Sequence, residues 1–174
     1  SNSTLDDAVR AATKVLAAQP DNIGALFTRG HANLRAGHPE RTLEDADQLL
    51  KLRPDDIAAI SLRGAALVDL KRVDEAEQTW RNIYEMAKKS GDENQAARNC
   101  AALATFFRTQ KQDDKAQTVF EECLRDFPAH ALLQQWVSDF YVETGQPEKS
   151  IAVWKQAVEK TPEDLGLRAK LADL

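Results

Sequence analysis

The chain has 174 residues, a net charge of −5 and an isoelectric point near 5.3, with 43% hydrophobic and 29% charged residues. This composition is typical of a folded protein and excludes global disorder. No apolar run reaches the roughly 18 residues that a membrane span requires, and an acidic chain without a basic stripe is a poor candidate for nucleic-acid binding.

Amphipathic runs separated by short breaks predict helices along the whole chain. We expect a first helix over 4–18, then the pairs 22–36/39–52, 56–70/73–89, 93–110/113–126 and 130–144/147–160, and a last helix from about 164. Short polar side chains before these runs predict N-caps at Asp21, Asp55 or Asp56, Asp92 and Asp164. Every connection is short, so no linker is expected.

A period of 34 residues runs through these helices. Pro20 and Pro54 lie 34 residues apart, as do Pro128 and Pro162, and the longer middle gap fits one further copy with six extra residues. Small residues recur at Gly30, Gly64, Ala104, Ser138 and Ala172, and again at Ala8, Thr42, Ala76, Ala116 and Ser150. A large apolar slot holds Trp80, Phe120 and Trp154. Antiparallel helices would bring the two small slots face to face and so allow close approach.

The order small, small, aromatic and proline at this period resembles the tetratricopeptide repeat (TPR). The resemblance implies an all-α fold, a right-handed superhelical solenoid of antiparallel helix pairs. We expect one domain over 1–174, with a lone helix 4–18, repeats at about 23–56, 57–96, 97–130 and 131–164, and a lone helix 165–174. Because both ends fall within a repeat, we interpret the chain as a fragment of a longer array. Uncapped ends that expose Leu167, Leu171 and Leu174 predict self-association.

Resemblance to this family also implies the function. Its members commonly bind peptides or helices in the concave groove formed by the first helix of each pair. A helical projection places these candidates for partner binding on that face: Phe27, His31, Leu34, Arg35, Leu62, Arg98, Thr105, Arg108, Gln135, Trp136 and Asp139. Such a mixed groove suits an amphipathic helix or an extended peptide. Trp136 is the expected anchor, although packing against a neighbouring helix explains it equally well.

One TPR subgroup clamps the C-terminal carboxylate of chaperone tails with Lys, Asn, Asn, Lys and Arg. The matching positions here hold Phe27, His31, Leu62, Arg98 and Ala102, and only Arg98 keeps the required charge. The resemblance therefore does not extend to that ligand.

A second hypothesis is a structural spacer array in a larger multidomain protein, such as an envelope or polysaccharide-export component. The sequence has no nucleophile motif, phosphate-binding loop or metal-ligand spacing, so we expect no enzyme activity, no cofactor and no metal site. The expected partner is a protein or peptide. The sequence leaves the compartment open between cytoplasm and periplasm.

Two pairs of residues depart from the repeat pattern. Cys100 and Cys123 face each other within one repeat, but helix axes about 8–10 Å apart usually place Cα atoms near or beyond the disulfide limit, so we expect both thiols to be reduced.

Arg29 and Arg63 occupy a leucine slot. We favour packing of their stems with the charged heads in solvent; the alternative is an arginine ladder that contacts a partner's carboxylates. The insertion 91–96 is expected to lengthen the helices around it.

Overall fold

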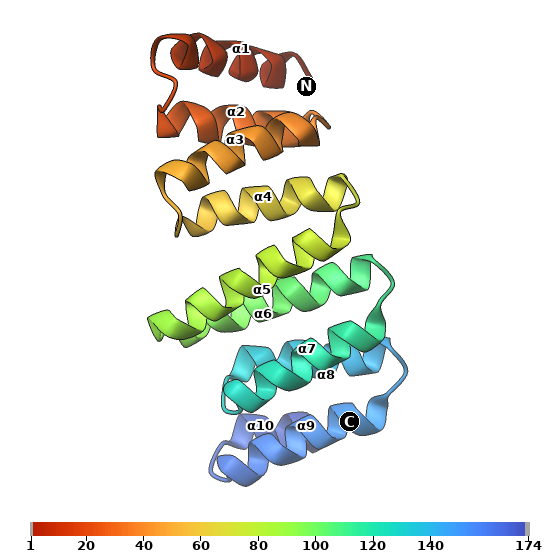
Figure 1. Ribbon diagram of the computed structural model, residues 1–174. Coiled ribbons are helices and arrows are strands. Elements are labelled where there is room, and N and C mark those ends of the chain that lie inside the picture. The colour runs from red at the N-terminus through yellow and green to blue at the C-terminus, as the bar shows by residue number, and fades with distance from the viewer. Residues whose placement is uncertain (1, 173–174) are drawn as a thin grey trace. The chain divides into compact units, whose positions relative to one another are not determined.

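The computed structural model describes residues 2–172, which form ten α-helices and no strand (Figure 1). The helices are α1 (Asn2–Ala18), α2 (Ile23–Arg35), α3 (Pro39–Leu52), α4 (Ile57–Asp69), α5 (Val73–Ser90), α6 (Glu93–Thr109), α7 (Asp113–Asp126), α8 (Ala131–Glu143), α9 (Pro147–Lys160) and α10 (Leu165–Ala172). The predicted all-α fold of paired helices is confirmed, and every described boundary agrees with the prediction to within a turn of helix.

The helices belong to two compact units, Ser1–Ile83 and Tyr84–Leu174, and the boundary lies inside α5. We call them unit 1 and unit 2. Within each unit, consecutive helices pack against each other: α1 on α2, α2 on α3 and α3 on α4 in unit 1, and α6 on α7, α7 on α8 and α8 on α9 in unit 2. The single domain over 1–174 stays a prediction.

Side chains in the preceding turn begin the first helix of each pair. Asp56 accepts hydrogen bonds from the first amides of α4, and Asp92 accepts one from the Gln95 amide. The predicted cap at Asp21 is wrong, because Asn22 lies one residue closer to the helix and accepts the Ala25 amide at 2.9 Å. These caps satisfy amides that have no partner within the helix.

The two small slots meet, as the sequence predicts. The Thr42 hydroxyl donates to the Gly30 carbonyl at 3.1 Å, and the hydroxyls of Ser138 and Ser150 lie 2.7 Å apart. A Cβ atom added at Gly30 would also lie 2.8 Å from a methyl group of Leu62 on α4, so glycine at this position lets the next pair pack closely as well. Helices in each pair therefore approach closely because these positions carry little or no side chain.

Large side chains fill the space next to the small slots. Trp154 is 2% exposed and donates its indole N–H to the Ser138 hydroxyl at 2.7 Å. Phe120 packs on Phe140 with 5.2 Å between ring centroids. Because a buried indole N–H needs an acceptor, Ser138 serves both as a small residue and as the hydrogen-bond partner of Trp154.

Arg29 and Arg63 form ion pairs within unit 1. The Arg29 guanidinium holds Asp45, whose side chain is only 2% exposed, with contacts of 2.6 and 3.0 Å. Arg63 donates to Asp47 at 2.9 Å and to the Thr79 hydroxyl at 3.1 Å. The expectation of solvated heads is met only in part: each arginine side chain keeps 27% of its surface exposed, but its guanidinium is paired with carboxylates of the chain itself.

The insertion lengthens its neighbours: α5 has 18 residues and α6 has 17, whereas the helices of the pair α2/α3 have 13 and 14. The added length of α5 brings its last turns to the end of α7 in unit 2. There the Tyr84 hydroxyl donates to Asp126 at 2.8 Å, and the Lys88 ammonium lies 2.6 Å from the same carboxylate. The predicted lengthening is confirmed, and it connects α5 to α7.

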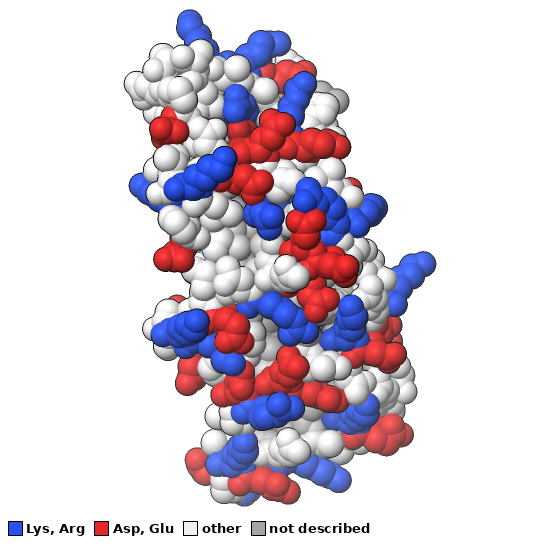
Figure 2. Space-filling model, viewed as in Figure 1, with Lys and Arg blue, Asp and Glu red and all other residues white. Residues whose placement is uncertain are grey.

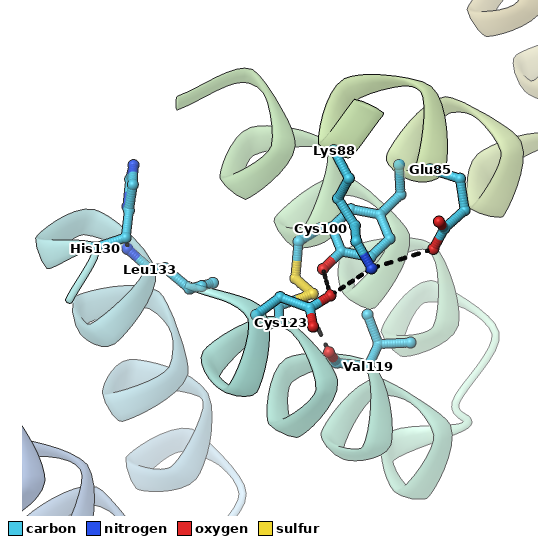
Figure 3. The surroundings of a disulfide bond; sticks show 9 residues. Glu85, Lys88, Cys100, Val119, Cys123, His130 and Leu133 are labelled. Atoms are coloured by element: carbon cyan, nitrogen blue, oxygen red, sulfur yellow. Dashed lines mark hydrogen bonds and ion pairs between the residues drawn. A yellow bond between two sulfur atoms is a disulfide. The ribbon is translucent and has the colours of Figure 1, made fainter. Parts of the chain in front are cut away.

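A disulfide joins Cys100 of α6 to Cys123 of α7, with Lys88 and Glu85 nearby (Figure 3). The expectation of reduced thiols is wrong. The Cα atoms are 6.3 Å apart, inside the range that a disulfide spans, because the small residues Ala104 and Ala116 let α6 and α7 approach closely. Neither cysteine is exposed.

The last helix, α10, packs on α9 but buries none of its own described residues. Leu165 is 76% exposed, and Leu167 and Leu171 are half-buried. Leu174 lies outside the described residues. Self-association through this end of the chain stays a prediction.

Candidate functional site

A hollow opens between α6 and α8 on the face of unit 2 formed by the first helices of its pairs. It encloses about 270 Å³ and is lined by Ala101, Thr105, Arg108, Phe120, Trp136, Asp139, Phe140 and Glu143. We call it the α6–α8 hollow. Its residues follow the helical period along α8, where Trp136, Phe140 and Glu143 are three or four positions apart and so share one side of the helix.

Aromatic rings form the floor of the hollow. Phe120 and Phe140 are 4% and 2% exposed and pack in a tilted pair. Trp136 is half-buried beside them, so part of its indole faces the opening. An apolar floor with an accessible aromatic ring favours binding of an apolar side chain, because burial removes both surfaces from water.

Charged side chains form the rim. Arg108 pairs with Glu143 at 2.7 Å and lies 5.5 Å from the centre of the Phe140 ring. Asp139 accepts a hydrogen bond from the Gln135 amide at 2.8 Å, and the Gln135 carbonyl oxygen accepts one from Lys170 at 2.6 Å. Because the Arg108–Glu143 pair is exposed, it contributes at most about 1 kcal/mol and can rearrange around a ligand. The other oxygen of the Asp139 carboxylate can still accept a hydrogen bond from a partner protein.

Of the predicted partner-binding residues, the structure brings together Thr105, Arg108, Trp136 and Asp139 around this hollow. Gln135 lies next to it through its bond to Asp139. Arg98 is exposed on α6 but does not line the hollow, and it donates to Gln95 at 3.1 Å.

The remaining predicted residues lie in unit 1. Phe27 and Leu34 pack partly on the core of unit 1, and the rings of Phe27 and His31 stack at 6.2 Å. Arg35 is exposed at the end of α2. Leu62 is 2% exposed and belongs to the core of unit 1. These residues are not among those that line the α6–α8 hollow.

Two residues of the floor were missed by reasoning from the sequence. Phe140 lies four positions after Trp136, so the helical period that identified Trp136 also points to Phe140. Phe120 comes from α7, the second helix of its pair, and so lies outside the face that a projection of the first helices defines. Its signal was present in the large apolar slot that it shares with Trp80 and Trp154.

Within residues 2–172, no group of three or more histidine, cysteine or acidic residues is placed to hold a metal ion. The described helices also include none that combines the length and hydrophobicity of a membrane span.

Family models for the tetratricopeptide repeat match the chain at residues 27–93 and again at 102–130. The human and rat proteins named DnaJ homolog subfamily C member 3 are 24% and 25% identical to it over 166 and 162 residues. Each match covers 88% of this chain and 32% of the relative, so the chain spans about a third of the length of these relatives.

Solved structures with the same fold include MamA, with a TM-score of 0.63, 21% identity and coverage of 91% of this chain and 90% of MamA. A fragment of MamA from Desulfovibrio magneticus gives a TM-score of 0.60 at 19% identity, covering 92% of this chain and 88% of that one. Three observations point to the same family. They are the two matches to repeat models, the contact between the small slots and the shared helical fold. The chain belongs to the tetratricopeptide repeat family.

Proposed function

We propose that the chain is a protein-interaction scaffold that binds a peptide or helix of a partner protein at the α6–α8 hollow. The observation that carries the proposal is the exposed part of Trp136 above the buried pair Phe120 and Phe140. TPR repeats are protein-interaction modules, and the hollow lies on the helix face that the sequence predicts for binding.

The size of the hollow favours a peptide over a free small molecule. Sites for drug-sized ligands enclose roughly 300–1,000 Å³ and bury most of the ligand, whereas this hollow encloses about 270 Å³ and is open. It therefore suits one apolar side chain of a longer segment. Burial of a leucine or phenylalanine side chain there would contribute about 1.5–3 kcal/mol.

The charged rim of the hollow can orient a bound peptide. Arg108, Asp139 and Glu143 offer both signs of charge within one hollow, and these groups can hydrogen-bond to the backbone or side chains of the partner. Charged groups at a rim add specificity more than affinity, whereas the aromatic anchor dominates the binding energy.

The test is selection of peptides from a displayed library against the chain, followed by affinity measurements with variants. Trp136→Ala should weaken the selected peptides by about 30-fold, the effect of losing about 2 kcal/mol at an anchor. Leu132→Ala is the matched control, because Leu132 is 54% exposed on the same helix and lies outside the hollow. Equal affinity of the selected peptides for the unmodified chain and for Trp136→Ala would contradict the proposal.

The spacer hypothesis makes the opposite prediction for the same site. If the repeats only set a distance between other parts of a larger protein, the pair of changes Trp136→Ala and Arg108→Glu should leave the function of that protein intact. Circular dichroism should show unchanged helicity in either case, since neither change touches a small slot.

We also propose that the chain folds in an oxidising compartment. Disulfides persist in such compartments and are rare where thiols are kept reduced, and this one is fully buried between α6 and α7. The intact mass of the protein isolated from its source with thiols blocked should be lower by two hydrogen atoms than that of the reduced chain. Two alkylated cysteines would exclude this compartment.

A further inference from the structure

A second cleft lies on the opposite helix face of unit 2, between α7 and α9. It encloses about 500 Å³, and Tyr141 of α8 reaches it from the layer behind. We call it the α7–α9 cleft. In Figure 1, α7 and α9 lie at the front of the view and α8 lies behind them. The cleft is larger than the α6–α8 hollow, is open to solvent and shares no lining residue with that hollow.

The interior of the cleft is apolar. Leu124 of α7 and Val153 of α9 line it from opposite sides, and Tyr141 lines it from α8. Tyr141 and Val153 are only 4% and 8% exposed. These side chains give the cleft an apolar base that favours one apolar side chain of a ligand.

Cationic side chains surround this base. Arg125 near the end of α7, and Lys149 and Lys160 at the two ends of α9, all line the cleft. No ion pair among the described residues neutralises these three charges, and Lys149 lies 5.4 Å from the centre of the Tyr141 ring. Asp126, next to Arg125 in sequence, is engaged by Lys88 at 2.6 Å.

The one acidic residue that lines the cleft is already hydrogen-bonded. Glu121 accepts from the Tyr141 hydroxyl at 3.2 Å and from the Gln117 amide at 2.7 Å. Burial, with a smaller contribution from Glu121, raises the pKa of Tyr141 to about 12, so the hydroxyl stays protonated and keeps donating. Both bonds fall on one oxygen of Glu121, and its negative charge remains. The lining still carries three cations against this one carboxylate, an excess of positive charge that favours the carboxylates of a ligand.

The local charge of the cleft is opposite to that of the whole chain, which carries −5. Figure 2 shows lysine and arginine side chains interspersed with acidic ones over the visible face, without a broad field of one sign. Such a surface does not suit a nucleic-acid backbone, which needs a continuous basic stripe. It suits a ligand that places a few negative charges at the rim and an apolar group at the base.

From these contacts we propose that the α7–α9 cleft binds an acidic peptide segment of a partner protein, with one apolar side chain against Leu124, Tyr141 and Val153 and its carboxylates on Arg125, Lys149 and Lys160. This goes beyond the proposed function, because it assigns a second site of opposite charge preference on the other helix face. With both sites, unit 2 could bind two peptide segments at the same time.

The test uses a short fluorescein-labelled peptide in which leucine is flanked on both sides by aspartate and glutamate, and a matched peptide with lysine at every acidic position. The acidic peptide should bind, and added salt should weaken its binding because the contacts are charged and exposed. The basic peptide should not bind. The double change Arg125→Glu with Lys149→Glu should weaken binding of the acidic peptide at least about tenfold.

Two control variants show whether the acidic peptide occupies this cleft. Lys155→Glu reverses one charge on α9, as Lys149→Glu does, but at an exposed position outside the cleft, so it should preserve binding. Trp136→Ala should also preserve it, which distinguishes failure of this proposal from failure at the α6–α8 hollow. Equal binding of the acidic and basic peptides, or undiminished binding to the doubly changed chain, would overturn the proposal.

Discussion

Lys71 and Lys111 occupy turn positions that favour glycine. Their φ angles are 60° and 57°, in the left-handed region, where Gly37 and Gly145 stand at 78° and 72° in the corresponding turns. A Cβ atom disfavours this conformation. We expect Lys71→Gly and Lys111→Gly each to raise the free energy of unfolding by about 0.5–1 kcal/mol, measured by urea denaturation.

The control for this prediction is Lys155→Gly in the middle of α9. Glycine there should lower the free energy of unfolding by about 1 kcal/mol, because it loses more backbone entropy in a helix. Destabilisation by all three changes would show that the two turns do not hold their lysines in a disfavoured conformation.

The ion pair between Arg29 and Asp45 is the most deeply buried charge contact in the described part of the chain. Arg29→Ala would leave the Asp45 carboxylate, 2% exposed, without its cation, and we expect a loss of about 3 kcal/mol in the free energy of unfolding. The exposed pair of Arg10 and Asp7 provides the comparison, since Arg10→Ala should cost less than about 1 kcal/mol. Similar costs for both changes would contradict the assignment of Asp45 to the interior.

Among the helices, α6 and α7 are joined covalently. Cross-linking positions 23 residues apart restricts the unfolded chain, and by loop-closure entropy this stabilises the fold by about 3 kcal/mol. The double change Cys100→Ala with Cys123→Ala should lower the free energy of unfolding by about that amount. Reductant should destabilise the unmodified chain and leave the double variant unaffected, and insensitivity of both would argue against the disulfide.

The end of α5 is held on α7 by a contact that depends on pH. The Lys88 ammonium, and to a smaller extent the Tyr84 hydroxyl, hold the pKa of the Asp126 carboxyl below its ordinary value. Its contribution to stability is therefore present above the unfolded pKa of about 3.9 and is lost as the pH falls through the lower folded value.

Urea denaturation between neutral pH and about pH 3 tests this dependence. The unmodified chain should lose more stability over that interval than Asp126→Asn, in which the group no longer titrates. The control is Asp55→Asn, at an exposed residue in the turn before α4, which should lose as much stability over this interval as the unmodified chain. Identical acid sensitivity of Asp126→Asn and the unmodified chain would contradict the role of Asp126.

At the scale of the molecule, the sequence predicts the helices and their pairing because the repeat constrains each position several times over. Small residues that recur at a fixed spacing within helices predict close helix contact, and that expectation is confirmed at Gly30 with Thr42 and at Ser138 with Ser150. The candidate hollow is predicted in part, since Trp136 and Arg108 follow from the TPR resemblance together with helical periodicity.

The contacts that depend on distances between helices were not predictable in the same way. A difference of about 1 Å in the Cα–Cα separation decides whether Cys100 and Cys123 can form a disulfide, because their separation lies near the upper limit of disulfide geometry. A typical spacing between helix axes is too coarse to predict that difference. The partner of Arg29 depends on which residue of α3 faces α2 at that height, and Asp45 is one of several acids in that helix. Repeat period determines the order of the helices but not these individual contacts.

We propose that unit 2 engages a partner at the exposed aromatic surface of the α6–α8 hollow. The most direct measurement is a crystal structure of the chain with a library-selected peptide bound. We predict an apolar side chain of the peptide on Trp136, above Phe120 and Phe140, with polar contacts to Arg108 or Asp139. A peptide seated away from this hollow, with Trp136 left uncovered, would contradict the account.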